Sequence, residues 1–297
     1  MRCPRQRVLI AVLCACLAPA PFVARPAGAQ PEAALPDNRD RGRLEFVLLP
    51  AGSFLMGSPD REWGSRTDEQ QRPVTLTRRF FLGKYEVTQA QWQAVMGRNP
   101  SFLYDCPDCP VENVTWYEAV AFCNALSRTL GFAPAYAIRD TIVTWDPAAD
   151  GIRLPTEAEW EYACRAGTST VFHTGDCLGT HEANYLGYDP QKGCEKGMWR
   201  GQALEIGHFP PNAWELHDMH GNVGEWVWDR HAFPSAQAAG DPRGPDRGAE
   251  RVIRGGNFRE LGRHCRSAVR HKAAPGQRFP WVGLRLARTA PAGLEQP

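Results

Sequence analysis

The chain has 297 residues, of which 43% are apolar and 23% are charged, so it is long enough for one large globular domain or two small ones. Its formal net charge of +1 argues against a nucleic-acid partner, since phosphate binding needs a broad basic face. The 28 glycines, 25 prolines and 10 tryptophans are typical of an irregular mixed fold with many turns, rather than of a helix bundle or a regular sandwich.

The N-terminus has the pattern of a secretory signal peptide over residues 1–29. A basic start precedes the apolar run 8–18, and Ala27-Gly28-Ala29 is a small-residue cleavage site. The apolar run is too short to cross a membrane. We therefore predict cleavage after Ala29 and a mature chain that is periplasmic or secreted. The alternative is a lipoprotein with its lipid anchor on Cys16.

The rest of the chain divides into a leader, one domain and a tail. Residues 30–42 are polar and contain two prolines, which predicts a flexible leader. Residues 43–288 contain no tandem repeat, heptad run or low-complexity tract, so we predict one domain there. Residues 289–297 form a tail, and the composition of 234–248 predicts a surface loop.

Several strands are expected from alternating or β-branched runs. Residues 44–49 and 53–57 flank Pro50-Ala51-Gly52, which predicts a hairpin. Residues 74–82 predict one further strand, and 135–144 a second hairpin. From residue 167 onward the chain is rich in loops, with short strands expected near 203–206, 225–228, 252–254 and 282–286.

Three helices are predicted from capping boxes, in which a threonine is followed three residues later by Glu or Gln. These pairs are Thr88 with Gln91, Thr115 with Glu118, and Thr156 with Glu159. Gly97 and Gly131 are expected to end the first two helices.

Seven of the ten cysteines remain after the predicted cleavage, and an odd number leaves at least one free thiol or an intermolecular bond. Cys106 and Cys109 lie in a proline-rich CPDCP loop without a second CxxC, which favours a local disulfide over a zinc half-site. Cys177 and Cys194 flank a loop, which a second disulfide would staple.

Residues 251–285 predict one wall of a pocket, because a glycine pair and a cluster of arginines lie between two β-type runs. Forked guanidinium groups suit a carboxylate or a peptide backbone. The predicted ligand-binding residues are Arg254, Asn257, Arg266, Arg270 and Trp281. The alternative is a set of structural ion pairs between the arginines and Glu157, Glu161 or Glu225.

The candidates for catalytic chemistry on this wall are Cys265 as nucleophile and Glu260 as base. His264 is adjacent to Cys265, and neighbouring residues of a strand point to opposite faces, so the two side chains are not expected to meet. His217 and His220 form an HxxH pattern in a loop that contains prolines and a glycine, which does not favour a transition-metal site.

Three segments together resemble the sulfatase-modifying factor, or formylglycine-generating-enzyme-like, family. They are IRLPTEAEWEYACRAG at 152–167, FPPNAWELHDMHGNVGEW at 209–226, and RVIRGG…CRSAVR…VGLRLA within 251–287. The resemblance covers essentially the whole mature chain. It implies an irregular α+β fold related to C-type lectins, with a pocket floored by the C-terminal third.

The family's best-known activity oxidises a sulfatase cysteine to formylglycine with oxygen and a copper ion that two cysteines hold. By resemblance, Glu260 stands where the first thiol should be, Gly262 lies about where the second would, and Cys265 is the one cysteine of the segment 257–266. Since monovalent copper prefers paired thiolates, we do not expect copper here.

The resemblance also concerns the other cysteines. It implies that Cys123 and Cys164 would be disulfide-bonded to residues that are here Leu286 and Ser267. Both cysteines are therefore expected to be reduced core residues, or to be joined to each other.

Calcium is a further expectation from the resemblance, since hard oxygens around a flexible turn suit this ion. The implied ligands are the carbonyls of His220, Gly221 and Val223 and the carboxylate of Glu225. A second site would use Asn184 and the carbonyl of Tyr185, with Asp189 as its acidic partner. The alternative is a glycine turn in which Glu225 pairs with an arginine.

We therefore expect an exported domain that binds a peptide, a glycan, a small molecule or another envelope ligand and that is not a copper-dependent formylglycine generator. The alternative is an oxidoreductase that modifies an exported protein or small molecule. Some exported family members that mature a siderophore are similar in lacking the cysteine pair.

Overall fold

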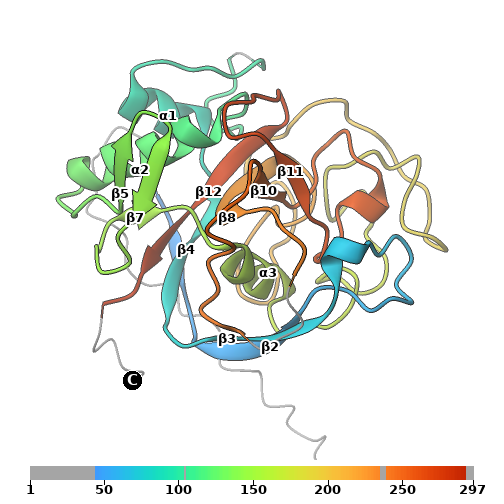
Figure 1. Cartoon of the computed structure of the whole chain (residues 1–297). Helices are drawn as coiled ribbons and strands as arrows, with labels where there is room; N and C mark the ends of the chain where they lie inside the picture. Colours follow the sequence, from blue (N-terminus) through green and yellow to red (C-terminus); the bar gives the residue numbers. More distant parts are fainter. Residues whose placement is uncertain (1–43, 104, 235–238, 292–297) are drawn as a thin grey trace, which may run out of the picture.

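The computed structural model describes residues 44–103, 105–234 and 239–291 (Figure 1). The predicted signal peptide, the leader and the end of the tail lie outside these residues. None of the described helices is long and apolar enough to cross a membrane.

A seven-stranded sheet forms the centre of the domain, in the order β1-β4-β12-β8-β10-β11, with β7 also paired to β12. Its strands are β1 (Phe46–Leu49), β4 (Phe80–Glu86), β7 (Ile152–Arg153), β8 (Gly224–Arg230), β10 (Arg251–Arg254), β11 (His271–Ala273) and β12 (Val282–Thr289). β12 runs parallel to β8, and the other pairs are antiparallel. The last strand of the chain therefore joins its first and middle parts.

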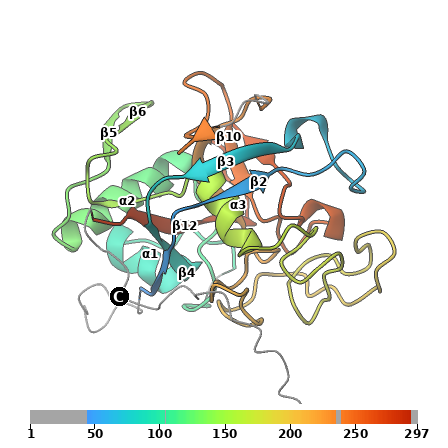
Figure 2. The same ribbon diagram turned by 90° about the horizontal axis from the view of Figure 1, so that it is seen from below.

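Two small sheets and the helices surround this centre. The small sheets contain β2 (Gly52–Met56), β3 (Arg72–Leu76) and β9 (Ala239–Gly240), and β5 (Tyr136–Arg139) with β6 (Ile142–Trp145). The helices are α1 (Gln89–Met96), α2 (Trp116–Thr129), α3 (Glu157–Arg165) and the 3-10 turns η1 (Thr67–Glu69) and η2 (Gly262–His264). Figure 2 shows α1 and α2 together, whereas α3 lies beside β2.

Both faces of the central sheet are covered by apolar side chains. On β4, Phe81 packs with Trp92 and Trp116 from α1 and α2, whereas its neighbour Leu82 packs with Trp160 from α3. Successive side chains of a strand point to opposite faces, so one strand contributes to two clusters. This mixed α+β arrangement confirms the predicted fold class.

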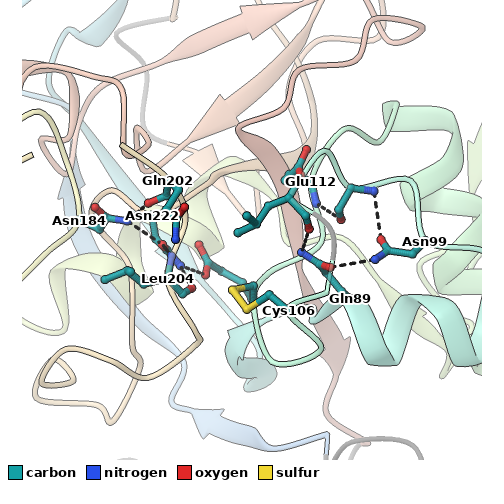
Figure 3. The surroundings of a disulfide bond; sticks show 12 residues. Gln89, Asn99, Cys106, Glu112, Asn184, Gln202, Leu204 and Asn222 are labelled. Atoms are coloured by element: carbon teal, nitrogen blue, oxygen red, sulfur yellow. Dashed lines mark hydrogen bonds between the residues drawn. A yellow bond between two sulfur atoms is a disulfide. The ribbon is translucent and has the colours of Figure 1, made fainter. Parts of the chain in front are cut away.

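All three predicted helices are confirmed, and each threonine makes both bonds of its capping box. Gly97 ends α1 with φ 75°, a left-handed conformation that glycine adopts without strain. The disulfide between Cys106 and Cys109 helps to start α1, because the Cys109 carbonyl accepts a hydrogen bond of 2.9 Å from the Gln89 N–H. Figure 3 shows the surroundings of this disulfide.

Three strand predictions are wrong. β1 and β2 do not form a hairpin, because the fully buried β1 pairs with β4 and the half-exposed β2 pairs with β3. The single strand expected at 74–82 is two strands, separated by the turn 77–79. Residues 203–206 form no strand, since the Asn222 side chain bonds both backbone groups of Leu204. The hairpin near 135–144 is confirmed as β5 and β6.

Candidate functional site

The cysteines fall into two classes. Cys106–Cys109 and Cys177–Cys194 form the two predicted disulfides. The other described cysteines, Cys123, Cys164 and Cys265, are reduced and buried.

Two of the reduced cysteines lie beside the residues that the resemblance gave as their partners. Cys123 shares a core cluster with Leu286. Cys164 lies close to the Ser267 hydroxyl. Burial raises the pKa of the Cys164 thiol, and the Ser267 hydroxyl offsets only part of that rise. Cys123 and Cys164 are therefore core residues, as expected, and they are not joined to each other.

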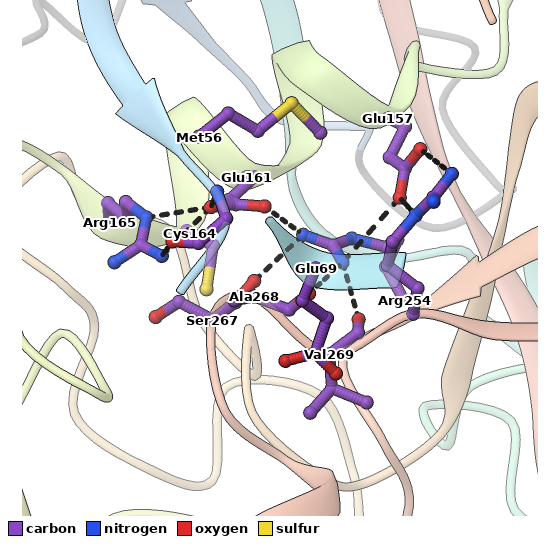
Figure 4. A network of polar contacts seen from close by, with 12 residues as sticks. Met56, Glu69, Glu157, Glu161, Cys164, Arg165, Arg254, Ser267, Ala268 and Val269 are labelled. Atoms are coloured by element: carbon purple, nitrogen blue, oxygen red, sulfur yellow. Dashed lines mark hydrogen bonds and ion pairs between the residues drawn. The ribbon is translucent and has the colours of Figure 1, made fainter. Parts of the chain in front are cut away.

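Arg254 lies at the centre of an inner network that faces α3 (Figure 4). Its side chain is fully buried, and Nη2 lies 2.6 Å from Glu161 Oε2. The guanidinium also donates to the carbonyls of Ser267 and Ala268, at 2.8 and 2.9 Å, and to that of Val269. Every one of these contacts is internal to the domain.

Arg270 and Arg266 extend this network toward the segment before β3. Arg270 forms a two-bond ion pair with Glu157, at 2.6 and 2.8 Å. Burial alone raises the pKa of Glu157, but the charges of Arg270 and Arg254 outweigh it and hold this pKa at about 2. Arg266 pairs with Glu69 at 2.9 Å and with Glu62.

The structure therefore gives Arg254, Arg266 and Arg270 the structural ion-pair role rather than the predicted ligand-binding role. Their side chains are 0%, 0% and 5% exposed, so no guanidinium of this group reaches a ligand at the surface. The cause is tertiary, because the carboxylates that hold them come from η1, the preceding loop and α3.

The first predicted calcium set does not fit a cation. Both carboxylate oxygens of Glu225 accept hydrogen bonds from Arg285, at 2.8–3.1 Å, and Oε2 also accepts one of 2.7 Å from the Trp160 indole. A second positive charge there would meet that of the fully buried Arg285. The turn after His220 is held by the backbone instead, since Gly221 donates to the Gly255 carbonyl and has φ 79°.

The second predicted calcium set has one favourable feature. Asn184 Oδ1 is buried and accepts no hydrogen bond from a described residue, whereas Nδ2 donates to the Gln202 carbonyl at 2.8 Å (Figure 3). The expected acidic partner, Asp189, faces Arg263 at 3.3 Å. The described residues contain no group of three or more His, Cys, Asp or Glu side chains that could hold a metal. Calcium at Asn184 and Tyr185 stays a prediction.

Cys265, the predicted nucleophile, is shielded from solvent. Its exposed fraction is 0%, and burial raises the pKa of its thiol, with Glu260 adding to the shift. A thiol with a raised pKa stays protonated at neutral pH and is a weak nucleophile. The His220 ring bonds the Cys265 carbonyl at 2.7 Å, not the sulfur. The geometry does not support a nucleophilic Cys265.

Glu260 and His264 form a hydrogen-bonded pair on the outer side of the same segment. His264 Nδ1 lies 2.6 Å from Glu260 Oε2, and the two side chains are 35% and 29% exposed. The hydrogen bond from His264 lowers the pKa of Glu260 and outweighs burial. The 3-10 turn η2, not the expected strand, brings residues 260 and 264 together and turns Cys265 inward. Glu260 and His264 are four positions apart in the sequence, and this spacing is the signal that could have predicted their contact.

Two aromatic side chains contact the residues that precede Glu260 in the chain. The Arg259 guanidinium lies 4.7 Å from the ring centroid of the half-buried Trp281. The Trp199 indole, 42% exposed, donates to the Phe258 carbonyl at 2.8 Å. Asn257 is buried and shapes the turn, since its Oδ1 accepts from the Arg259 N–H at 2.9 Å. We call Trp199, Arg259, Glu260, His264 and Trp281 the outer face.

The outer face differs from the predicted site in three members. Trp199, Arg259 and His264 were not among the predicted site residues, and an exposed tryptophan in a loop gives no signal of which segment it will contact. Of the predicted set, Trp281 and Glu260 belong to this face. Such a face can accept and donate hydrogen bonds and can stack flat groups.

Comparison with known proteins places this arrangement in a family. The model of the sulfatase-modifying factor enzyme 1-like domain matches residues 32–290. The chain is 35% identical to the chaperone protein LppX of Paenibacillus barcinonensis, over 64% of this chain and 73% of that protein. It is 33% identical to the formylglycine-generating enzyme of Mus musculus, over 82% of this chain and 74% of the enzyme.

A solved structure agrees with this match. Treponema denticola variable protein 1 superposes with a TM-score of 0.71 at 32% identity, covering 84% of this chain and 97% of that one. The fold and these sequence matches together show that the chain belongs to the sulfatase-modifying factor enzyme 1-like family.

Proposed function

We propose that this protein is an exported member of its family that binds a peptide segment of another protein on the outer face and does not generate formylglycine with copper. The observation that carries the proposal is the hydrogen bond of 2.6 Å between Glu260 and His264, because Glu260 is the residue that, by resemblance, stands in place of the family's first copper-binding thiol. Export is supported by the signal-like N-terminus and by two disulfides, which persist outside the cytoplasm.

The thiol chemistry supports the absence of copper oxidation. A copper site of the family type needs two thiolates, and Cys265 is protonated and buried. Cys109 and Cys194 are bound in disulfides, so neither supplies the second sulfur.

The chemistry of the outer face supports a peptide ligand. Glu260 offers a carboxylate acceptor and His264 an imidazole ring to backbone or side-chain polar groups, while Trp199 and Trp281 offer flat apolar surfaces. Peptide recognition commonly combines such aromatic anchors with a few placed polar groups. One relative is named as a chaperone protein, which is consistent with a polypeptide ligand.

A mass measurement tests the exclusion of copper chemistry. The purified protein is incubated with a CxPxR-type sulfatase peptide, copper and oxygen, and the peptide is weighed by mass spectrometry. We expect the cysteine to remain unchanged, with a copper-loaded formylglycine-generating enzyme as positive control. Conversion of the thiol to the aldehyde would overturn this part of the proposal.

Selection from a displayed random-peptide library tests the binding role. We expect enrichment of peptides that bind the wild-type protein, and at least about tenfold weaker binding to an Arg259→Ala/Glu260→Gln variant, since it loses charged contacts. The matched control, Lys272→Ala/Glu250→Gln, removes an exposed ion pair whose side chains are each 40% exposed. Equal binding by all three proteins, or no enrichment, would reject the outer face as a peptide site.

A further inference from the structure

We propose that a separate hollow binds a small phosphate- or sulfate-type anion. The hollow has a volume of about 130 Å³ and lies where five distant segments meet. It shares no residue with the outer face. We call it the basic hollow and define it by Arg78, Trp145, Arg153, Asp241, Arg243 and Thr289.

The charges lining the basic hollow are unbalanced. The full lining of the hollow contains four arginines and two carboxylates, which leaves a formal excess of two positive charges. These residues are Arg78, Arg79, Arg153, Arg243, Glu159 and Asp241. The whole chain carries only +1, so the excess is local. Side chains of one sign in a concave site concentrate counter-ions of the other sign.

Both carboxylates are already engaged. Glu159 binds Arg153 through two bonds of 2.7 Å. Asp241 accepts a hydrogen bond of 2.7 Å from the Thr77 N–H and another from the Thr77 hydroxyl. Glu159 is therefore neutralised by Arg153, whereas Asp241 is held by uncharged donors and keeps the negative charge that the excess of two already includes.

Arg78 and Arg243 supply the uncommitted charge. Both side chains are exposed, and neither forms an ion pair with a carboxylate in the described part of the chain. Arg243 is positioned by Trp145, whose ring centroid lies 4.8 Å from its guanidinium carbon and 5.0 Å from that of Arg153. Stacking of this kind orders a long side chain before a ligand arrives, which reduces the entropy lost on binding.

Size and geometry select the ligand class. A cavity of about 150 Å³ holds a benzene molecule, so the basic hollow suits a group of about six heavy atoms or fewer. Phosphate and sulfate meet this limit, and their oxygens match the forked donors of arginine. Two uncommitted guanidiniums match the double charge of such an anion.

Calorimetric titration of the purified protein with potassium phosphate at low ionic strength tests the site. We expect saturable binding that weakens with added salt and falls at least about tenfold in Arg78→Gln/Arg243→Gln, because charge-assisted hydrogen bonds are lost. The matched control is Arg61→Gln/Arg247→Gln, which removes the same charge from exposed positions elsewhere. Thermal midpoints equal to that of the wild-type protein confirm that both variants fold.

Two further titrations define the ligand. Glycerol phosphate that binds more tightly than inorganic phosphate indicates an esterified headgroup, and weaker binding indicates the free anion; both outcomes support the site. Absence of saturable phosphate binding, or an equal loss of affinity in the two double variants, would overturn the proposal. Tighter binding of succinate than of phosphate would overturn the assigned ligand class.

Discussion

Replacing Arg254 by methionine tests whether the inner network holds the domain together. Arg254 is fully buried, pairs with Glu161 at 2.6 Å, and donates to the Ser267 and Ala268 carbonyls. Breaking a buried ion pair costs about 3–5 kcal/mol, because the remaining charge stays in a medium of low dielectric constant. Arg165 still holds Glu161 at 2.9 Å, which favours the lower end of that range.

The orphaned carbonyls add to this cost. Each buried carbonyl left without a donor costs about 1 kcal/mol or more, so we expect Arg254→Met to lower the free energy of unfolding by about 5 kcal/mol. That is a large part of the roughly 5–15 kcal/mol that stabilises a typical domain. Arg254→Lys keeps the charge but loses the fork, and we expect a smaller loss of about 2 kcal/mol.

Urea unfolding followed by tryptophan fluorescence measures these changes. Arg259→Met is the matched control, because this arginine belongs to the same segment but is exposed, and its effect should stay within about 0.5 kcal/mol. If Arg254→Met does not fold, the lysine variant still reports the network. A free energy of unfolding for Arg254→Met within about 1 kcal/mol of the wild-type value would refute the structural role.

Three further predictions follow from the buried thiols and imidazoles. Iodoacetamide should label Cys265 only after unfolding, and labelling of the native protein at the denatured rate, read by peptide mass spectrometry, would contradict its burial. Burial lowers the pKa of His173 from 6.5 to about 4 and that of His220 well below 6.5. The unfolded chain therefore binds protons that the native rings refuse, so these histidines destabilise the native state as the pH drops from about 6.5 to about 4. Burial raises the pKa of Asp218 to about 6 and that of Asp229 to about 8, which acts in the opposite direction, so the histidine contribution is read from a comparison with a variant. The free energy of unfolding in urea of the wild-type protein minus that of His173→Gln should fall by up to about 1.4 kcal/mol per pH unit over this range, and a difference that does not change with pH would exclude a neutral buried ring. Ser267→Cys should form a disulfide with Cys164 and stabilise the domain by up to about 4–5 kcal/mol, whereas two free thiols in a non-reducing peptide map would show that the geometry is wrong.

The sequence alone determined the features that depend on near neighbours. The three helices begin at threonines whose capping partners lie three residues away, so both ends of each bond are visible in one short window. The two disulfides join cysteines separated by 3 and 17 residues, within single loops. The hairpin of β5 and β6 likewise pairs adjacent segments.

Only the tertiary structure decided which strands pair and which way the arginines face. β1 pairs with β4 rather than with the adjacent β2, because the buried residues of β1 belong to the central sheet. Arg266 looks equally suited to a ligand or to an ion pair in the sequence, and Glu69, 197 residues away, settles the choice by reaching it inside the fold. A buried guanidinium must donate its hydrogen bonds to groups inside the protein, and here the carboxylates that accept them come from distant segments. No local sequence pattern therefore predicts these ion pairs.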